Sequence, residues 1–158
     1  MNEKRVSGKG SMNNRKGFTL VEAMIVICIM AVVAAIAIPQ FQKMAINGNL
    51  KAAAKDVLSD FSSMRGRAIS ENANFSIVFN IGSNNYTVPG LASPKTPTYF
   101  ANDIRVDSTS FGSTITFQTR GTTSPPGDKT ISLTNGRGST ATITIGTAGR
   151  IYVQYNLK

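Results

Sequence analysis

The chain has 158 residues and a formal net charge of +9, and it contains no histidine and one cysteine. The absence of histidine excludes a Ser-His-Asp triad and a His-ligated metal site, and a single cysteine excludes an internal disulfide and a Cys-only zinc site. Nearly half of the excess positive charge precedes Gly17, so the rest of the chain is only mildly basic and the total overstates any case for nucleic acid.

The first element in chain order is an apolar segment that follows this basic cluster. From Ala23 to Ile38 no side chain is charged or polar apart from the Cys28 thiol, which we expect to be a small buried hydrophobe. Extension back to Phe18 adds only Thr19 and Glu22. About 20 apolar residues can span a bilayer as a helix. The basic residues before the segment should stay cytoplasmic, which places the bulk of the chain outside the cytoplasm.

Three interpretations of this segment compete. A cleaved secretory signal fits the basic flank and the small residues Ala35 and Ala37, but its apolar region is normally about 7–15 residues long. A plain signal anchor explains the length but not Glu22, because an intramembrane carboxylate costs about 2.5–3.5 kcal/mol on insertion scales and needs a partner. The third interpretation rests on the residues that surround Gly17.

The string from Lys16 to Glu22, Lys-Gly-Phe-Thr-Leu-Val-Glu, resembles the prepilin peptidase site of type IV pilins and type II secretion pseudopilins. The resemblance implies cleavage after Gly17, N-methylation of the new terminal residue Phe18, and an assembly role for Glu22. A carboxylate there would pair with the amine freed at Phe18 of a neighbouring subunit and set subunit register. The simpler alternative is that a negative charge is favoured near a helix N-terminus.

The second half of the helix begins after Pro39, which removes a backbone donor and predicts either a kink or loosened turn or the end of the span. Apolar residues then recur at spacings of three and four, which predicts an amphipathic helix to about Ser70 with a weak point at Asn47-Gly48-Asn49. We expect the apolar stripe to pack against a sheet. It comprises Leu50, Ala54, Val57, Leu58, Phe61, Met64 and Ala68.

From Asn74 onward apolar and polar residues alternate, which marks antiparallel strands with one buried face. The expected strands lie around Phe75–Phe79, Ile115–Phe117, Ile131–Leu133, Ile143–Ile145 and Ile151–Tyr155. Asn135-Gly136 predicts a hairpin turn and Asn84-Asn85 a weaker one. The Pro-containing segments Pro89–Pro97 and Thr122–Asp128 are predicted as loops.

A helix followed only by strands predicts an α+β fold, with the second half of the helix on antiparallel sheet. This is also the pilin-like architecture. We expect a basic leader at 1–17, a transmembrane and assembly helix at 18–39, an amphipathic helix half at 40–72 and a β-rich head at 73–158. The head resembles GspH/FimT-type minor pseudopilins and minor pilins. The residues that carry this likeness are Arg65-Gly66-Arg67-Ala68-Ile69, Phe117-Gln118-Thr119-Arg120-Gly121 and Gly149-Arg150.

The sequence carries no enzyme signature, since Gly136-Arg137-Gly138 lacks the Lys-Ser/Thr ending of a phosphate loop. We expect no cofactor and no metal. The resemblance implies a single-pass subunit of the bacterial inner membrane with its head outside the cytoplasm, destined for a periplasmic or extracellular filament. Its partners would be other pilin or pseudopilin subunits and the prepilin peptidase. Pilus and secretion systems share the motif, so the sequence leaves both open.

DNA is a further candidate partner. FimT-like minor pilins of natural transformation bind DNA through a Gly-Arg-x-Arg pattern. Gly149-Arg150-Ile151-Tyr152 keeps the first arginine and replaces the second with tyrosine, while Arg137 and Lys158 would add charge. Because phosphate neutralisation needs several cations on one face, the competing account of Arg150 is a strand-edge cation that aids solubility.

Overall fold

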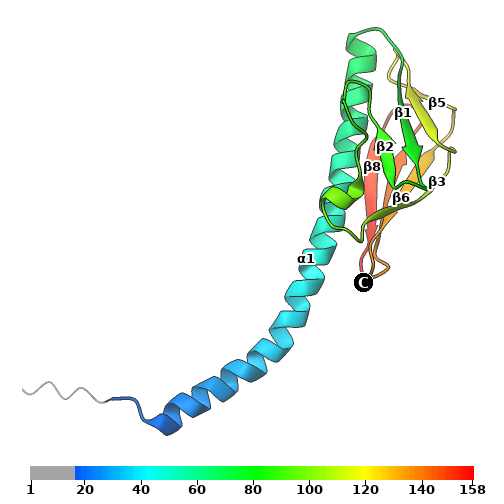
Figure 1. Cartoon of the computed structure of the whole chain (residues 1–158). Coiled ribbons are helices and arrows are strands. Elements are labelled where there is room, and N and C mark those ends of the chain that lie inside the picture. The colour runs from blue at the N-terminus through cyan, green and yellow to red at the C-terminus, as the bar shows by residue number, and fades with distance from the viewer. Residues whose placement is uncertain (1–16) are drawn as a thin grey trace, which may run out of the picture. The chain divides into compact units, whose positions relative to one another are not determined.

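The computed structural model describes residues 17–158, and the leader predicted at 1–17 lies outside this range except for Gly17. A single long helix, α1, runs from Leu20 to Ser70 and is followed by short strands (Figure 1). The strands are β1 (Phe75–Asn80), β2 (Asn85–Thr87), β3 (Arg105–Thr109), β4 (Thr114–Phe117), β5 (Thr123–Ser124), β6 (Lys129–Thr134), β7 (Thr140–Ile145) and β8 (Ile151–Asn156), and the 3₁₀ helix η1 (Pro97–Tyr99) lies between β2 and β3. The chain divides into two compact units, one up to Pro39 and one from Gln40 to Lys158.

The first unit contains the apolar half of α1. Thr19 caps its N-terminus, because the Thr19 hydroxyl oxygen accepts the backbone N–H of Glu22 at 3.2 Å and the Thr19 carbonyl accepts that of Ala23 at 3.2 Å. α1 remains helical through Pro39, so the predicted loosening is not seen in the described residues. Cys28 is exposed. The expectation that it is buried is wrong, because no other element among residues 17–158 covers this part of the helix.

The second unit contains the other half of α1, whose apolar stripe packs on the sheets as predicted. Helix residues Leu50, Ala53, Ala54, Val57, Phe61, Met64 and Ala68 are buried. Phe61 is central to this contact, since its ring lies 6.0 Å from both Phe79 of β1 and Phe117 of β4. The helix passes through Gly48 without a break, so the predicted weak point at Asn47–Asn49 does not interrupt it.

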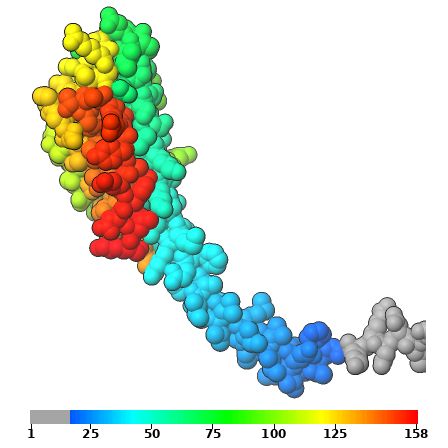
Figure 2. Space-filling view, turned by 180° about the vertical axis from the view of Figure 1, so that it is seen from behind, coloured from blue at the N-terminus to red at the C-terminus, as the bar shows by residue number. Residues whose placement is uncertain are grey.

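The strands form two antiparallel sheets, with orders β2-β1-β4-β5 and β3-β6-β7-β8. Alternate residues of the strands point into one shared core; Ile77, Ile115, Ile131, Leu133, Ile143 and Ile145 have no exposed surface. The free edge strand β8 runs beside the second half of α1, as the red strand beside the cyan-to-green helix shows in Figure 2. The ring of Tyr155 in β8 accordingly lies under the Lys51 ammonium of α1, 5.8 Å from the ring centre.

All of the predicted strands are present, as β1, β4, β6, β7 and β8, and α1 ends at Ser70 as expected. β2, β3 and β5 were not predicted, and β5 falls inside the segment predicted as the loop Thr122–Asp128. The Asn135-Gly136 turn is in the right place but is longer than a two-residue hairpin. It joins Thr134 to Thr140, and Gly138 supplies its positive φ of 74°.

Candidate functional site

The predicted processing and assembly residues lie at the start of α1. Phe18 is 77% exposed, and Glu22 occupies the third position of the helix with an exposed side chain. Among residues 17–158 no ion pair includes Glu22. Only its backbone N–H joins the Thr19 cap, so the carboxylate is available to a group outside the chain.

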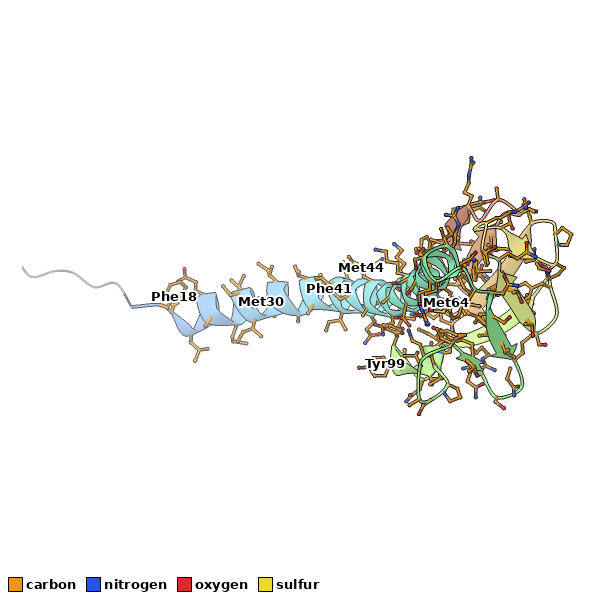
Figure 3. The ribbon with its side chains drawn as sticks, turned by 90° about the horizontal axis from the view of Figure 1, so that it is seen from above. Phe18, Met30, Phe41, Met44, Met64 and Tyr99 are labelled. Carbon is orange, nitrogen blue, oxygen red and sulfur yellow. The ribbon has the colours of Figure 1, made fainter. Side chains whose placement is uncertain are left out.

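The helical segment that follows is apolar on every side, and no other element that the structure describes covers it. It is long and apolar enough to cross a membrane, and none of its most apolar window is buried. Side chains such as Phe18, Met30 and Phe41 project from the ribbon in Figure 3 without a neighbouring element. A surface of this kind, with exposed apolar side chains all round, indicates contact with lipid or with other helices.

The three head motifs that carried the subfamily resemblance meet at one point. The Arg65 guanidinium, on α1, donates from Nε to the Gly121 carbonyl at 3.0 Å and from a terminal nitrogen to the Ala148 carbonyl at 3.3 Å. Gly149 is buried between them with a φ of 76°. A β-carbon on Gly149 would collide with the Gly121 carbonyl oxygen and with Arg65. The motifs therefore fasten the β4–β5 and β7–β8 turns to the helix.

A second polar attachment, which the sequence analysis missed, lies at the other end of the head. Asn47 Oδ1 accepts the Ser139 hydroxyl at 2.9 Å and the Asn135 amide at 3.4 Å, and Asn47 Nδ2 donates to the Lys158 carbonyl at 3.2 Å. Ser139 and Asn135 are buried. Asn47 thus ties the β6–β7 turn and the residue that follows β8 to the helix. The sequence signal that could have revealed this attachment is the position of Asn47, a polar residue one helical turn before the first residue of the apolar stripe.

A third attachment lies midway along the amphipathic half of α1. Lys95 Nζ lies 2.5 Å from Asp56 and 2.7 Å from Asp60, and the Tyr86 hydroxyl donates to Asp60 at 2.8 Å. Burial raises the pKa of Tyr86, and the two carboxylates raise it further. Partial burial acts to lower the pKa of Lys95, but its hydrogen bonds to Asp56 and Asp60 outweigh this and raise it. These groups hold the 88–97 segment against the helix.

The predicted DNA-binding residues do not form one surface. Arg150 lies in the β7–β8 turn, whereas Arg137 and Lys158 lie beyond the opposite ends of β7 and β8. These strands have six residues each, about 20 Å of chain. The turn that carries Arg120 is instead close to the turn that carries Arg150, because Gly121 and Gly149 are in contact. In the part of the chain that the structure describes, no cluster of three potential metal ligands occurs.

Comparison with known proteins identifies the family to which the chain belongs. A model of the prokaryotic N-terminal methylation motif matches residues 12–38. A model of type II transport protein GspH matches residues 53–149, more than half of the chain. The chain belongs to the GspH family. The resemblance drawn from Lys16–Glu22 and from the head motifs is confirmed.

Solved structures confirm the fold. The minor pilin FimU of Pseudomonas aeruginosa is 20% identical with a TM-score of 0.56, over 68% of this chain and 90% of FimU. The minor pseudopilin EpsH from the type 2 secretion system of Vibrio cholerae is 10% identical with a TM-score of 0.54, over 68% of this chain and 97% of EpsH. Among curated proteins, a sequence comparison finds no match. The GspH-family chain thus has the predicted α+β pilin-like architecture.

Proposed function

We propose that this protein is a minor pilin or pseudopilin that assembles through its N-terminal helix into a type IV pilus or a type II secretion pseudopilus. Prepilin peptidase removes the leader 1–17 after Gly17, and Phe18 becomes the N-methylated terminus. Residues 18–39 cross the bacterial inner membrane once, and the unit that follows lies outside the cytoplasm. The observation that supports this proposal is the apolar segment 18–39, which no described element covers and whose one charged side chain is Glu22.

The same observation supports a direct role for Glu22 in assembly. A lone carboxylate in a bilayer costs about 2.5–3.5 kcal/mol, and its N-terminal position on the helix offsets only part of this. In the mature chain the amine of Phe18 would be a positive charge at the same depth. Pairing Glu22 with the Phe18 amine of a neighbouring subunit removes the cost only when subunits meet, which favours assembly over free diffusion.

The remaining segments have supporting roles in this proposal. The amphipathic half, 40–72, carries the head, 73–158, through its buried stripe and its three polar attachments at Asn47, at Asp56 and Asp60, and at Arg65. Subunits would therefore be added to a filament as helix and head together, and no enzymatic step is assigned to the chain.

The decisive test is mass spectrometry of the mature N-terminus of the protein from its native host. The expected result is a chain that begins at N-methylated Phe18. A start at Ile38 would indicate an ordinary secretory signal, and an intact leader would indicate a signal anchor. Either of these two results would overturn the proposal.

A filament-borne DNA receptor is a second candidate, and it is favoured by one observation. Arg120 and Arg150 are exposed on adjacent turns at the same end of the head, where their charges would act together. The test is binding of duplex DNA at low and high salt by the full chain in detergent. Arg120→Gln/Arg150→Gln should abolish the salt-sensitive binding, while Arg137→Gln, at the other end, should leave it intact. Absence of binding by the wild type at low salt rejects this candidate.

A further inference from the structure

A group of lysines surrounds a shallow hollow at the end of the head where the chain emerges from the apolar segment. The hollow, of about 370 Å³, lies between α1 and the residues that follow β8. Lys43, Lys51 and Lys158 line it, together with the apolar side chains of Met44 and Leu157. Met44 is 70% exposed and Leu157 38% exposed. We call this set the proximal basic hollow.

The cations of the proximal basic hollow have no acidic partner in the described part of the chain. None of the ion pairs there includes Lys43, Lys51 or Lys158. Arg137 extends the positive surface, because its neighbour Gly138 lies beside the Lys158 ammonium, 3.4 Å from the position of a β-carbon. The ammonium of Lys51 lies over a tyrosine ring, a contact that leaves its charge uncompensated.

The acids of the described residues form no ion pair with these cations. Asp56 and Asp60, on the same helix, pair with Lys95. Asp103 accepts the backbone N–H of Gly136 at 2.9 Å. The proximal basic hollow is therefore not a network of internal ion pairs in the described residues.

Chain continuity places one of these lysines next to the membrane. Lys43 follows Pro39 by four residues of the same helix, about 6 Å along its axis. If 18–39 spans the bilayer, Lys43 lies at the level of the phospholipid headgroups in any orientation of the head. Lysine side chains at such positions extend their ammonium groups to phosphate while their stems remain against apolar groups.

We propose that the proximal basic hollow binds the phosphate headgroups of anionic phospholipids in the leaflet that the head faces. Met44 and Leu157 contact the adjoining apolar part of the lipid, and Lys43, Lys51 and Lys158 hold the phosphate, with Arg137 beside them. The inference rests on the proposed function, because it requires the 18–39 segment to span the membrane. It assigns Arg137 and Lys158 to lipid phosphate rather than to the phosphate of DNA.

Lipid explains the composition of the hollow better than a protein or nucleic-acid partner does. Its lining combines lysines, which bind phosphate as point charges, with the apolar side chains of Met44 and Leu157. Duplex DNA offers no apolar surface to match Met44 and Leu157 at such a site. Headgroup binding would hold the head of a waiting subunit on the bilayer, and these contacts would be lost when the subunit enters a filament.

The test uses the full chain in nanodiscs, with Cys28→Ala and a fluorophore attached through Asn156→Cys, an exposed position beside the hollow. The probe is a quencher carried on the lipid headgroup, in discs of phosphatidylcholine alone or with phosphatidylglycerol. We expect quenching to be at least about twofold stronger in the anionic discs and to fall at high salt. Lys43→Gln/Lys51→Gln/Lys158→Gln should remove the difference. Arg120→Gln/Arg150→Gln is a control with charge removed at the other end of the head.

The outcomes separate this inference from the proposed function. Equal quenching in the two kinds of disc, or a difference that the lysine variant retains, overturns the lipid site even when the chain is firmly inserted. Failure of the chain to insert, measured by its release from discs in alkaline carbonate, overturns both. Unchanged quenching combined with loss of filament incorporation in the lysine variant would assign the hollow to a neighbouring subunit and overturn the lipid site.

Discussion

Arg65 and Gly149 are in direct contact, and this contact joins two motifs that lie 84 positions apart in the sequence. The Arg65 side chain fits because Gly149 has no β-carbon, and its guanidinium then reaches the carbonyl groups of Gly121 and Ala148. The family motifs that contain Arg65 and Gly149 are here part of the internal attachment of the head to its helix. The guanidinium donors that bind these carbonyls are unavailable to an anion.

Substitution of Gly149 should therefore be more costly than its backbone angle alone implies. Gly149→Ala introduces both a left-handed non-glycine residue and a collision with Arg65, so we expect it to lower the free energy of unfolding by about 3 kcal/mol or more. Gly112 is a matched control, because its φ of 77° is nearly the same and a β-carbon there meets nothing within 4 Å. Gly112→Ala should cost only about 1–2 kcal/mol. Urea unfolding in detergent, followed by near-UV circular dichroism, measures both. Equal costs would show that the Arg65 contact is unimportant.

The polar attachment at Asn47 gives a second prediction. Asn47→Ala removes the acceptor of the buried Ser139 hydroxyl, so we expect a loss of about 1–3 kcal/mol in unfolding free energy. It should also speed amide hydrogen exchange near the end of β8, because the bond to the Lys158 carbonyl is lost. Asn49→Ala is the control, since the same helix carries Asn49 without a side-chain hydrogen bond in the described structure, and it should change stability by less than about 0.5 kcal/mol. The idea fails if the two variants have the same stability.

The sequence predicts the elements in which apolar residues recur at a regular spacing, and it misses those defined by tertiary contacts. α1 was predicted because its apolar spacing is a local property. β3 was missed because Val106 is its only apolar residue, and the strand forms by pairing with β6. The role of Asn47 was missed for the same reason, since its partners follow it by about 90 positions or more. The proposed processing site is inferred from the sequence alone, because a peptidase reads a site of this kind as a short linear string.

The cluster of Lys95 with Asp56 and Asp60 predicts that the stabilising contribution of Lys95 to the fold is lost at alkaline pH. Because the folded-state pKa of Lys95 is raised, its stabilising contribution is complete below the unfolded pKa of about 10.4 and is lost as the pH rises through the folded value. Lys95→Met should therefore destabilise the chain more at pH 8 than at pH 11. Lys55→Met, which removes an exposed lysine from the same helix, should show no such dependence. Unfolding at each pH checks this, and a cost of Lys95→Met that grows above pH 10 contradicts it.

Processing at Gly17 gives a prediction in the native host. Gly17→Val places a β-branched side chain where the proposed cut requires a close approach of the peptidase to the backbone, so the leader should be retained. The measurement is the mass of the chain, which should be that of the precursor with no N-methyl group. Removal of the leader at Phe18 in this variant would refute the proposed site.

The role of Glu22 can be separated from its place in the helix cap. Glu22→Ala removes the carboxylate but keeps the backbone N–H that binds Thr19, so processing and insertion should be normal while incorporation into filaments falls at least about tenfold. Thr19→Ala is the complementary variant, because it removes the cap, worth about 1 kcal/mol, and keeps the charge. Quantifying each variant in sheared filaments and in the membrane fraction gives the comparison. If Thr19→Ala impairs incorporation as strongly as Glu22→Ala, the helix start rather than the charge controls assembly, and the proposed pairing with the Phe18 amine is wrong.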